Sequence, residues 1–193
     1  MKLVLASKSP RRREILSMVT NNFTVRVSEA DETHNGIDPF LVPEHLAKIK
    51  ADATPIYEDE IIIGADTIVI YKGEVLGKPK NKDEAVKMLE SLSGTVHYVV
   101  SGVCIKSKKK SVSFSVTTSV KMRELENCEI YAYVEKFNPV DKAGAYGIQE
   151  MAGAFVEEIN GDFYNVVGLP LCKLISTLKK EFNVDLIGDI YLD

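Results

Sequence analysis

Apolar residues in the first half of the chain alternate between strand-like runs and helix-like spacing. Residues 3–5 form a short apolar run before a polar turn. Residues 61–70 form a nearly continuous run, which is typical of a strand covered on both faces. A further strand is predicted where residues 23–27 alternate. Helical spacing predicts three helices, over about residues 10–19, 43–53 and 82–92.

Capping and turn residues mark where these elements begin and end. Ser9 followed by Pro10 suits the start of the first helix, and Asn81 with Glu84 resembles a capping box at the start of the third. Residues 72–73, Lys-Gly, predict a tight turn after the long apolar run. The inner side of the second helix is predicted to carry three apolar residues, Leu46, Ile49 and Ala53.

The second half of the chain predicts more strands than helices. Strands are expected over residues 99–105, 112–122, 155–159 and 163–167, the last two joined at the hairpin signal Asn160-Gly161. Helices are expected over residues 126–137 and 170–182. Strands and helices alternate at first, whereas the later strands pair as hairpins. The sequence therefore predicts one domain over residues 1–193, an α/β fold with a mixed β-sheet flanked by helices.

Composition narrows the class of protein. The 193 residues are 45% hydrophobic and 27% charged, as in soluble globular proteins, and a net charge of -4 argues against binding a nucleic acid polymer. No apolar run is long enough to predict a membrane span or the core of a signal peptide, so we expect a cytoplasmic protein. The lysine run at residues 106–110 is expected to be a solvated hairpin tip. The three cysteines and three histidines are scattered, so reduced thiols and no zinc site are expected.

The segment at residues 7–13, Ser-Lys-Ser-Pro-Arg-Arg-Arg, is the first with candidate chemistry. It lies where a strand leads into a helix N-terminus, which attracts anions through free N–H groups. Consecutive arginines oppose the helix dipole there unless a bound polyphosphate reverses the local charge. We therefore expect Arg11 and Arg12 to bind phosphate, and Arg13 to be only solvated.

Asp66 is the second candidate, because it interrupts the apolar run with a carboxylate. An ionised group between triplets of branched apolar residues is costly without compensation, and glycine beside it suits a strand that opens into a cleft. The alternative is a turn aspartate that caps backbone amides. We favour a functional role.

Other candidates are weaker when each is taken alone. Glu32 belongs to an acidic group in which Glu29 and Asp31 are expected to be solvated; if Glu32 reaches Asp66, the two could share Mg²⁺ or Mn²⁺ with a triphosphate. Lys50 and Lys78 are more often surface lysines, although a lysine before proline is held extended. The glycine-rich segment 141–149 ends in Gln149, whose amide could read a base edge, although it could equally be an ordinary loop.

The chain contains no P-loop, no dinucleotide-binding glycine pattern and no serine-hydrolase elbow. Together, its segments resemble the Maf family of nucleotide pyrophosphatases. The matching stretches, in family order, are LASKSPRRR at 5–13, GADTIV at 64–69, GKP at 77–79, SLSG at 91–94, DKAGAYGIQ at 141–149 and YNVVGLPL at 164–171.

The resemblance implies a fold like that of inosine triphosphate pyrophosphatases, with a cleft between two lobes. It implies metal-dependent hydrolysis of a nucleoside triphosphate to monophosphate and pyrophosphate, with Asp66 as the proposed proton acceptor and Arg11, Thr67 and Gln149 tuning substrate choice. Further positions that fall in the family's cleft are Ser7, Ser9, Arg12, Glu32, Lys50 and Lys78.

The form of the 141–149 segment resembles the branch that prefers dTTP and UTP. Two departures from the family pattern are Lys8 and Glu150, where glycine is frequent, and Glu150 bears on the fit of the base. A homodimer is a family expectation. Two alternatives remain open: a nucleotide-binding regulator of cell division, and a sister enzyme for methylated or purine nucleotides.

Overall fold

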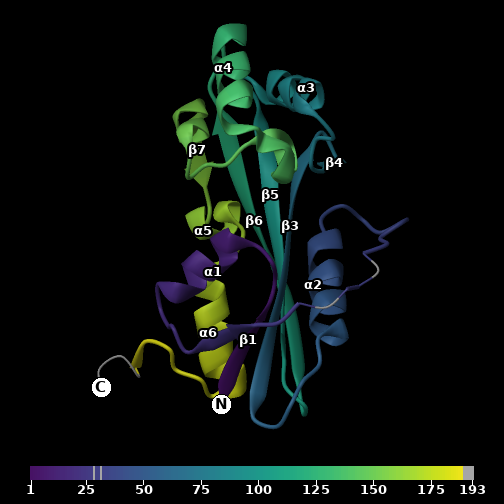
Figure 1. Ribbon diagram of the computed structural model, residues 1–193, viewed down its shortest axis with the longest axis vertical. Helices are drawn as coiled ribbons and strands as arrows, with labels where there is room; N and C mark the ends of the chain where they lie inside the picture. Colours follow the sequence, from purple (N-terminus) through teal and green to yellow (C-terminus); the bar gives the residue numbers. More distant parts are fainter. Residues whose placement is uncertain (28, 31, 189–193) are drawn as a thin grey trace. The chain divides into compact units, whose positions relative to one another are not determined.

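The computed structural model describes all residues except 28, 31 and 189–193, and the chain divides into two compact units (Figure 1). The first unit comprises Met1–Asp66, Ser101–Val116 and Gly168–Asp193, and the second comprises Thr67–Val100 and Thr117–Val167. Three long strands, β3 (Glu60–Tyr71), β5 (Val96–Lys106) and β6 (Ser111–Met122), each begin in one unit and end in the other.

The first unit is built around parallel strands. β1 (Lys2–Ala6) pairs in parallel with β2 (Phe23–Val25) on one side and with the first part of β3 on the other. Its helices are α1 (Pro10–Ser17), α2 (Val42–Ala53) and α6 (Leu171–Phe182). In Figure 1, α2 lies on one side of these strands, and α1 and α6 lie on the other.

Two glycines allow α2 to lie directly on the strands. A Cβ atom at Gly64 of β3 would lie 2.3 Å from the carbonyl oxygen of Ala47, and one at Gly102 of β5 would lie 2.2 Å from the amide nitrogen of Glu44. A real Cβ atom cannot lie so close to backbone atoms, so only glycine fits at these two positions. The close approach explains why small residues, Ala47 and Ala51, are the buried ones at this contact.

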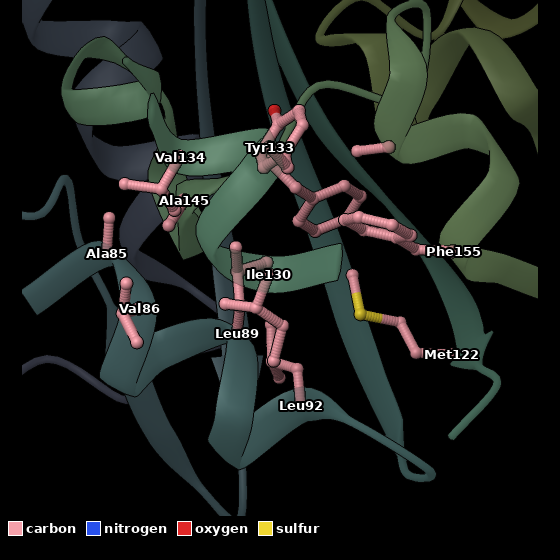
Figure 2. Close-up of a cluster of buried hydrophobic side chains, with 12 residues drawn as sticks. Ala85, Val86, Leu89, Leu92, Met122, Ile130, Tyr133, Val134, Ala145 and Phe155 are labelled. Atoms are coloured by element: carbon pink, nitrogen blue, oxygen red, sulfur yellow. The ribbon is translucent and has the colours of Figure 1, made fainter. Parts of the chain in front are cut away.

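The second unit combines antiparallel strands with short helices. β4 (Glu74–Leu76) pairs with β3, and β7 (Val156–Asn160) pairs with β6, both antiparallel. The helical elements are α3 (Lys82–Leu92), α4 (Asn127–Phe137), α5 (Phe163–Val167), and three 3₁₀ turns, η1 (Pro139–Asp141), η2 (Ala143–Ala145) and η3 (Met151–Phe155). Their apolar side chains form a cluster around Tyr133 and Phe155, whose rings meet edge to face (Figure 2).

The predicted mixed α/β sheet is confirmed. Seven strands are hydrogen bonded in the order β2-β1-β3-β5-β6-β7, with β4 on β3, and both parallel and antiparallel pairs occur. Ser9 caps α1 with Pro10 at its first turn, as expected, and the tight turn at residues 72–73 joins β3 to β4. Asn81 caps α3, but the carboxylate of Glu84 accepts from the amide of Lys80, so only half of the predicted capping box is formed.

The prediction of a strand over residues 163–167 is wrong, because this segment forms α5. The carboxylate oxygen Oδ1 of Asp162 accepts hydrogen bonds from the amides of Tyr164 and Asn165, at 2.8 and 3.2 Å. This capping satisfies the first free N–H groups of a helical turn. The hairpin signal therefore ends a strand but does not begin another.

The predicted inner side of α2 is wrong in part. Leu46 is buried as expected, but Ile49 is half-buried and Ala53 is exposed, while Ala47 and Ala51 are buried instead. The reason is the contact with Gly64, which requires the smallest side chains to face the strand. Apolar spacing alone does not show where a helix must come closest to a sheet.

Three lysines at the turn from β5 to β6 are paired with acidic groups. Lys106 lies 2.6 Å from Asp52, Lys108 contacts Glu58 at 2.5 Å, and Lys110 contacts Glu181. These contacts neutralise the run locally. In the part of the chain that the structure describes, no helix has both the length and the apolar character that crossing a membrane requires.

Candidate functional site

The polar loop between β1 and α1 holds its serines in fixed positions. Ser7 is buried, and its Oγ accepts from the amide of Ser9 at 3.3 Å. The Oγ of Ser9 in turn accepts from the amide of Arg12 at 3.4 Å and caps α1. This loop therefore leads the chain from the buried strand directly into a helix N-terminus, as the sequence predicted.

The guanidinium of Arg12 is fixed from two sides within the first unit. Its Nε donates to the carbonyl oxygen of Gly168 at 2.8 Å, and its Nη1 donates to Ser7 Oγ at 3.0 Å. Burial lowers the pKa of Arg12, while the negative charges of Asp66 and, more weakly, Glu32 act in the opposite direction. Arginine remains protonated all the same. Arg12 is therefore an oriented cation within electrostatic reach of Asp66.

Asp66 lies inside β3, in contact with a lysine, and not in a turn. The Nζ atom of Lys50 on α2 lies 2.6 Å from Asp66 Oδ1 and 3.1 Å from Glu32 Oε2. The side chain of Asp66 is 13% exposed, so it is neither sealed in the core nor free in solvent. The costly carboxylate predicted from the sequence is thus compensated by Lys50.

The two carboxylates around Lys50 supply oxygen donors of the kind that Mg²⁺ or Mn²⁺ takes. Both Glu32 and Asp66 place an oxygen within ion-pair distance of one ammonium group. Mg²⁺ is commonly held by one or two carboxylates together with substrate phosphates. Among the described residues, no three Cys, His, Asp or Glu side chains gather as metal ligands. Asp31 lies outside the residues that the structure describes. A metal here would therefore depend on the phosphates for its remaining ligands.

Three further residues of these segments differ in exposure. Arg11 is half-buried, whereas Arg13 and Glu29 are exposed, in agreement with the solvated positions expected for the last two. The first unit carries seven of the predicted site residues, Ser7, Ser9, Arg11, Arg12, Glu32, Lys50 and Asp66. Contacts join Ser7 and Ser9 to Arg12, and Lys50 to both Glu32 and Asp66.

Residues 2–181 match the family described as Maf-like protein. The chain belongs to this family. It is 48% identical over 191 residues to a protein of Alkaliphilus metalliredigens named dTTP/UTP pyrophosphatase, and the matched residues make up 96% of this chain and 99% of that protein. Proteins with the same name from Parabacteroides distasonis and Clostridium novyi are each 50% identical, over 92% and 90% of this chain and 95% and 94% of their own lengths. A solved structure of the Ham1 protein of Staphylococcus aureus aligns with a TM-score of 0.47 at 14% identity, over 63% of this chain and 72% of that one.

The second unit of this Maf-like chain carries three further predicted residues, Thr67, Lys78 and Gln149. Thr67 is half-buried in β3, and Lys78 and Gln149 are exposed. The segments that carry them are joined through Gly144. Its amide donates to the carbonyl oxygen of Gly77 at 3.1 Å, and a Cβ at Gly144 would lie 3.0 Å from Val69.

Sequence reasoning missed two residues that hold the glycine-rich segment of the Maf-like chain. His97 is fully buried, and its Nε2 lies 2.7 Å from the hydroxyl of Tyr146. Lys142 is also buried. In a strand, residues two apart lie on the same face, so the position of His97 two residues before the apolar Val99 could have indicated that it is buried. Nothing in the pattern indicated that Lys142 would be buried.

Proposed function

We propose that this protein is a nucleoside triphosphate pyrophosphatase that hydrolyses dTTP and UTP to the monophosphate and pyrophosphate. The observation that carries the proposal is the Lys50–Asp66 pair with Arg12 beside it, in a chain about half identical to proteins named dTTP/UTP pyrophosphatase. A compensated carboxylate next to oriented cations is the arrangement that phosphate chemistry requires.

In the proposed reaction, water attacks the α-phosphorus of the substrate. A bond forms between the water oxygen and this phosphorus, the bond to the bridging α–β oxygen breaks, and pyrophosphate leaves with the electron pair. Asp66 accepts the proton that the water loses. Arg11 and Arg12 bind phosphate oxygens. Because phosphoryl transfer depends mainly on positioning and charge neutralisation, fixing Arg12 through Ser7 and Gly168 is itself a contribution to rate.

Glu32 and Asp66 are the residues that would hold a divalent metal. When bound, such an ion neutralises phosphate charge and polarises the reacting oxygens. Lys50 contacts both carboxylates and keeps them side by side. In the second unit, Thr67, Lys78 and Gln149 would contact the nucleotide, with the amide of Gln149 directed to the base.

The experiment that tests the proposal is pyrophosphate release from dTTP by the wild type and by Asp66→Asn. We expect turnover to fall by a factor on the order of 10² to 10⁴, because the proton acceptor is lost while the shape of the side chain is kept. Asp52→Asn is the matched control, since Asp52 is also paired with a lysine of the first unit, Lys106, and is expected to keep full activity.

Binding of dTTP by Asp66→Asn, measured by calorimetry, separates catalysis from simple nucleotide binding. Retained binding without turnover supports the enzyme, whereas near-normal release of pyrophosphate by this variant contradicts the role given to Asp66. A panel of nucleoside triphosphates with Mg²⁺ or Mn²⁺ then tests the preference for dTTP and UTP. Faster turnover of a purine or methylated nucleotide would reject that preference.

A further inference from the structure

Lys142 is a buried cation in the second unit whose charge is compensated by two carboxylates. Only 7% of the residue is exposed. Its Nζ lies 3.0 Å from Asp141 Oδ1 and 3.3 Å from Glu150 Oε1. The side chain of Asp141 is 65% exposed and that of Glu150 is 34% exposed, so Glu150 lies the deeper of the two. A buried ammonium group requires such partners.

The Lys142–Glu150 pair lies across a tight turn. The amide of Glu150 donates to the carbonyl oxygen of Gly147 at 3.0 Å, and this bond closes a four-residue turn with Ile148 and Gln149 in its middle. A Cβ atom at Gly147 would lie 3.0 Å from Lys142 Cε and 3.3 Å from Glu150 Cδ. Both side chains therefore rest against the glycine that begins the turn.

The turn is held from its other side as well. The amide of Gly147 donates to the hydroxyl of Tyr133 at 3.1 Å, and the preceding residue, Tyr146, is buried against His97. The beginning of the turn is thus fixed by the core of the second unit. Its end is held by the Lys142–Glu150 ion pair and by two backbone hydrogen bonds, one from the amide of Glu150 to Gly147 and one from the amide of Gly153 to the carbonyl oxygen of Glu150.

We propose that Glu150, through its ion pair with Lys142, fixes the turn that presents Gln149 and thereby sets the base selectivity of the enzyme. Glu150 is a positioning residue, because it acts through Gln149. The inference rests on the proposed function, in which the Gln149 amide contacts the base. An amide places a donor and an acceptor in fixed order, so its orientation decides which base edge it matches. Thymine offers an acceptor where cytosine offers an amino donor.

The test compares kcat/KM for dTTP and dCTP in Glu150→Gln and in Asp141→Asn. Both substitutions remove one negative charge from beside Lys142, but only Glu150 belongs to the turn. We expect the ratio of kcat/KM for dTTP to that for dCTP to fall about fivefold in Glu150→Gln, because a partly exposed ion pair contributes a free energy equivalent to about fivefold at most. The ratio should stay unchanged in Asp141→Asn. In a Gln149→Ala background, Glu150→Gln should leave the ratio unchanged.

Each other outcome overturns the inference. An equal change in both variants would assign the effect to the charge of Lys142 and not to the turn. A lower rate at an unchanged ratio, or a full effect in the Gln149→Ala background, would show that Glu150 does not act through Gln149. If the wild type fails to hydrolyse dTTP, the proposed function itself is rejected, whereas hydrolysis with an unaffected ratio in Glu150→Gln rejects only the present inference.

Discussion

The guanidinium of Arg12 donates to a serine hydroxyl five residues before it and to a glycine carbonyl 156 residues after it. Its place at a helix N-terminus could be read from the sequence, because caps and prolines are local signals. The acceptor at Gly168 could not, since only the tertiary fold brings it near. Gly168 has a φ of 125°, a backbone conformation that glycine adopts readily and other residues rarely do.

We predict that Gly168→Ala lowers kcat/KM for dTTP because its carbonyl no longer orients Arg12. The effect should be non-additive with Arg12→Lys: in a double-mutant cycle, Gly168→Ala should cost clearly less once the guanidinium is absent. Gly36→Ala is the control, because Gly36 also has a positive φ, 78°, with nothing near its Cβ position. Additive effects in the cycle would contradict the link to Arg12.

At the scale of elements, α2 and β3 place the central pair of the first unit. Gly64 lets the helix approach the strand, and Lys50 of that helix reaches Asp66 two residues further along the strand. The sequence predicted both elements and singled out both charged residues. It could not predict that Lys50 contacts Asp66, because the residues next to a lysine in the sequence do not show whether its side chain will be half-buried or solvated.

We predict that Gly64→Ala destabilises the protein by about 3 kcal/mol and also reduces turnover of dTTP. The added Cβ would meet backbone atoms of α2, so that the helix must move away and carry Lys50 from Asp66. Urea unfolding and pyrophosphate release measure the two effects. Gly77→Ala, where a Cβ would have open space, should leave the free energy of unfolding nearly unchanged. Equal stability of the two variants would disprove the close helix–strand contact.

The failed prediction of a strand over residues 163–167 has a local cause. The segment 163–167 has the apolar content of a strand and follows a hairpin signal, but the capping carboxylate of Asp162 starts a helix there and no hairpin forms. Aspartate is favoured both in turns and as the cap of a helix, so the residue alone does not show which of the two it forms. Local patterns therefore predicted β3 and α6 well, but they did not predict α5.

For the whole molecule, the stretches that carry the family resemblance are divided between the two units. The chain crosses from one to the other in the middle of β3, between Asp66 and Thr67, both of which were predicted site residues. The order of the predicted strands and helices indicated the mixed fold, but no sequence pattern indicated where one compact unit would give way to the next.

Stability of the whole chain should fall in mild acid because of His97. Burial lowers the pKa of His97 to about 4. The unfolded chain therefore binds this proton more tightly, and stability present above pH 6.5 is lost as the pH falls towards 4. The full effect is roughly 3 kcal/mol, with about 2 kcal/mol lost between pH 7 and pH 5.

We predict that His97→Gln flattens this part of the pH profile, as measured by urea unfolding at pH 7 and pH 5. The amide can still hydrogen bond to Tyr146 but does not titrate. His45→Gln is the control: His45 is exposed on α2, and that variant keeps His97 and therefore the wild-type loss. An unchanged slope in His97→Gln would mean that other groups cause the acid sensitivity.

The lysine held between Glu32 and Asp66 gives the resting protein its own counter-ion. Two neighbouring carboxylates would otherwise repel each other whenever nothing else is bound, and the segment carrying Glu32 would tend to move away. Because the ammonium group of Lys50 belongs to the chain, the two carboxylates stay close together before any ligand binds. The charge of the acidic pair is thus balanced by a side chain of the protein itself.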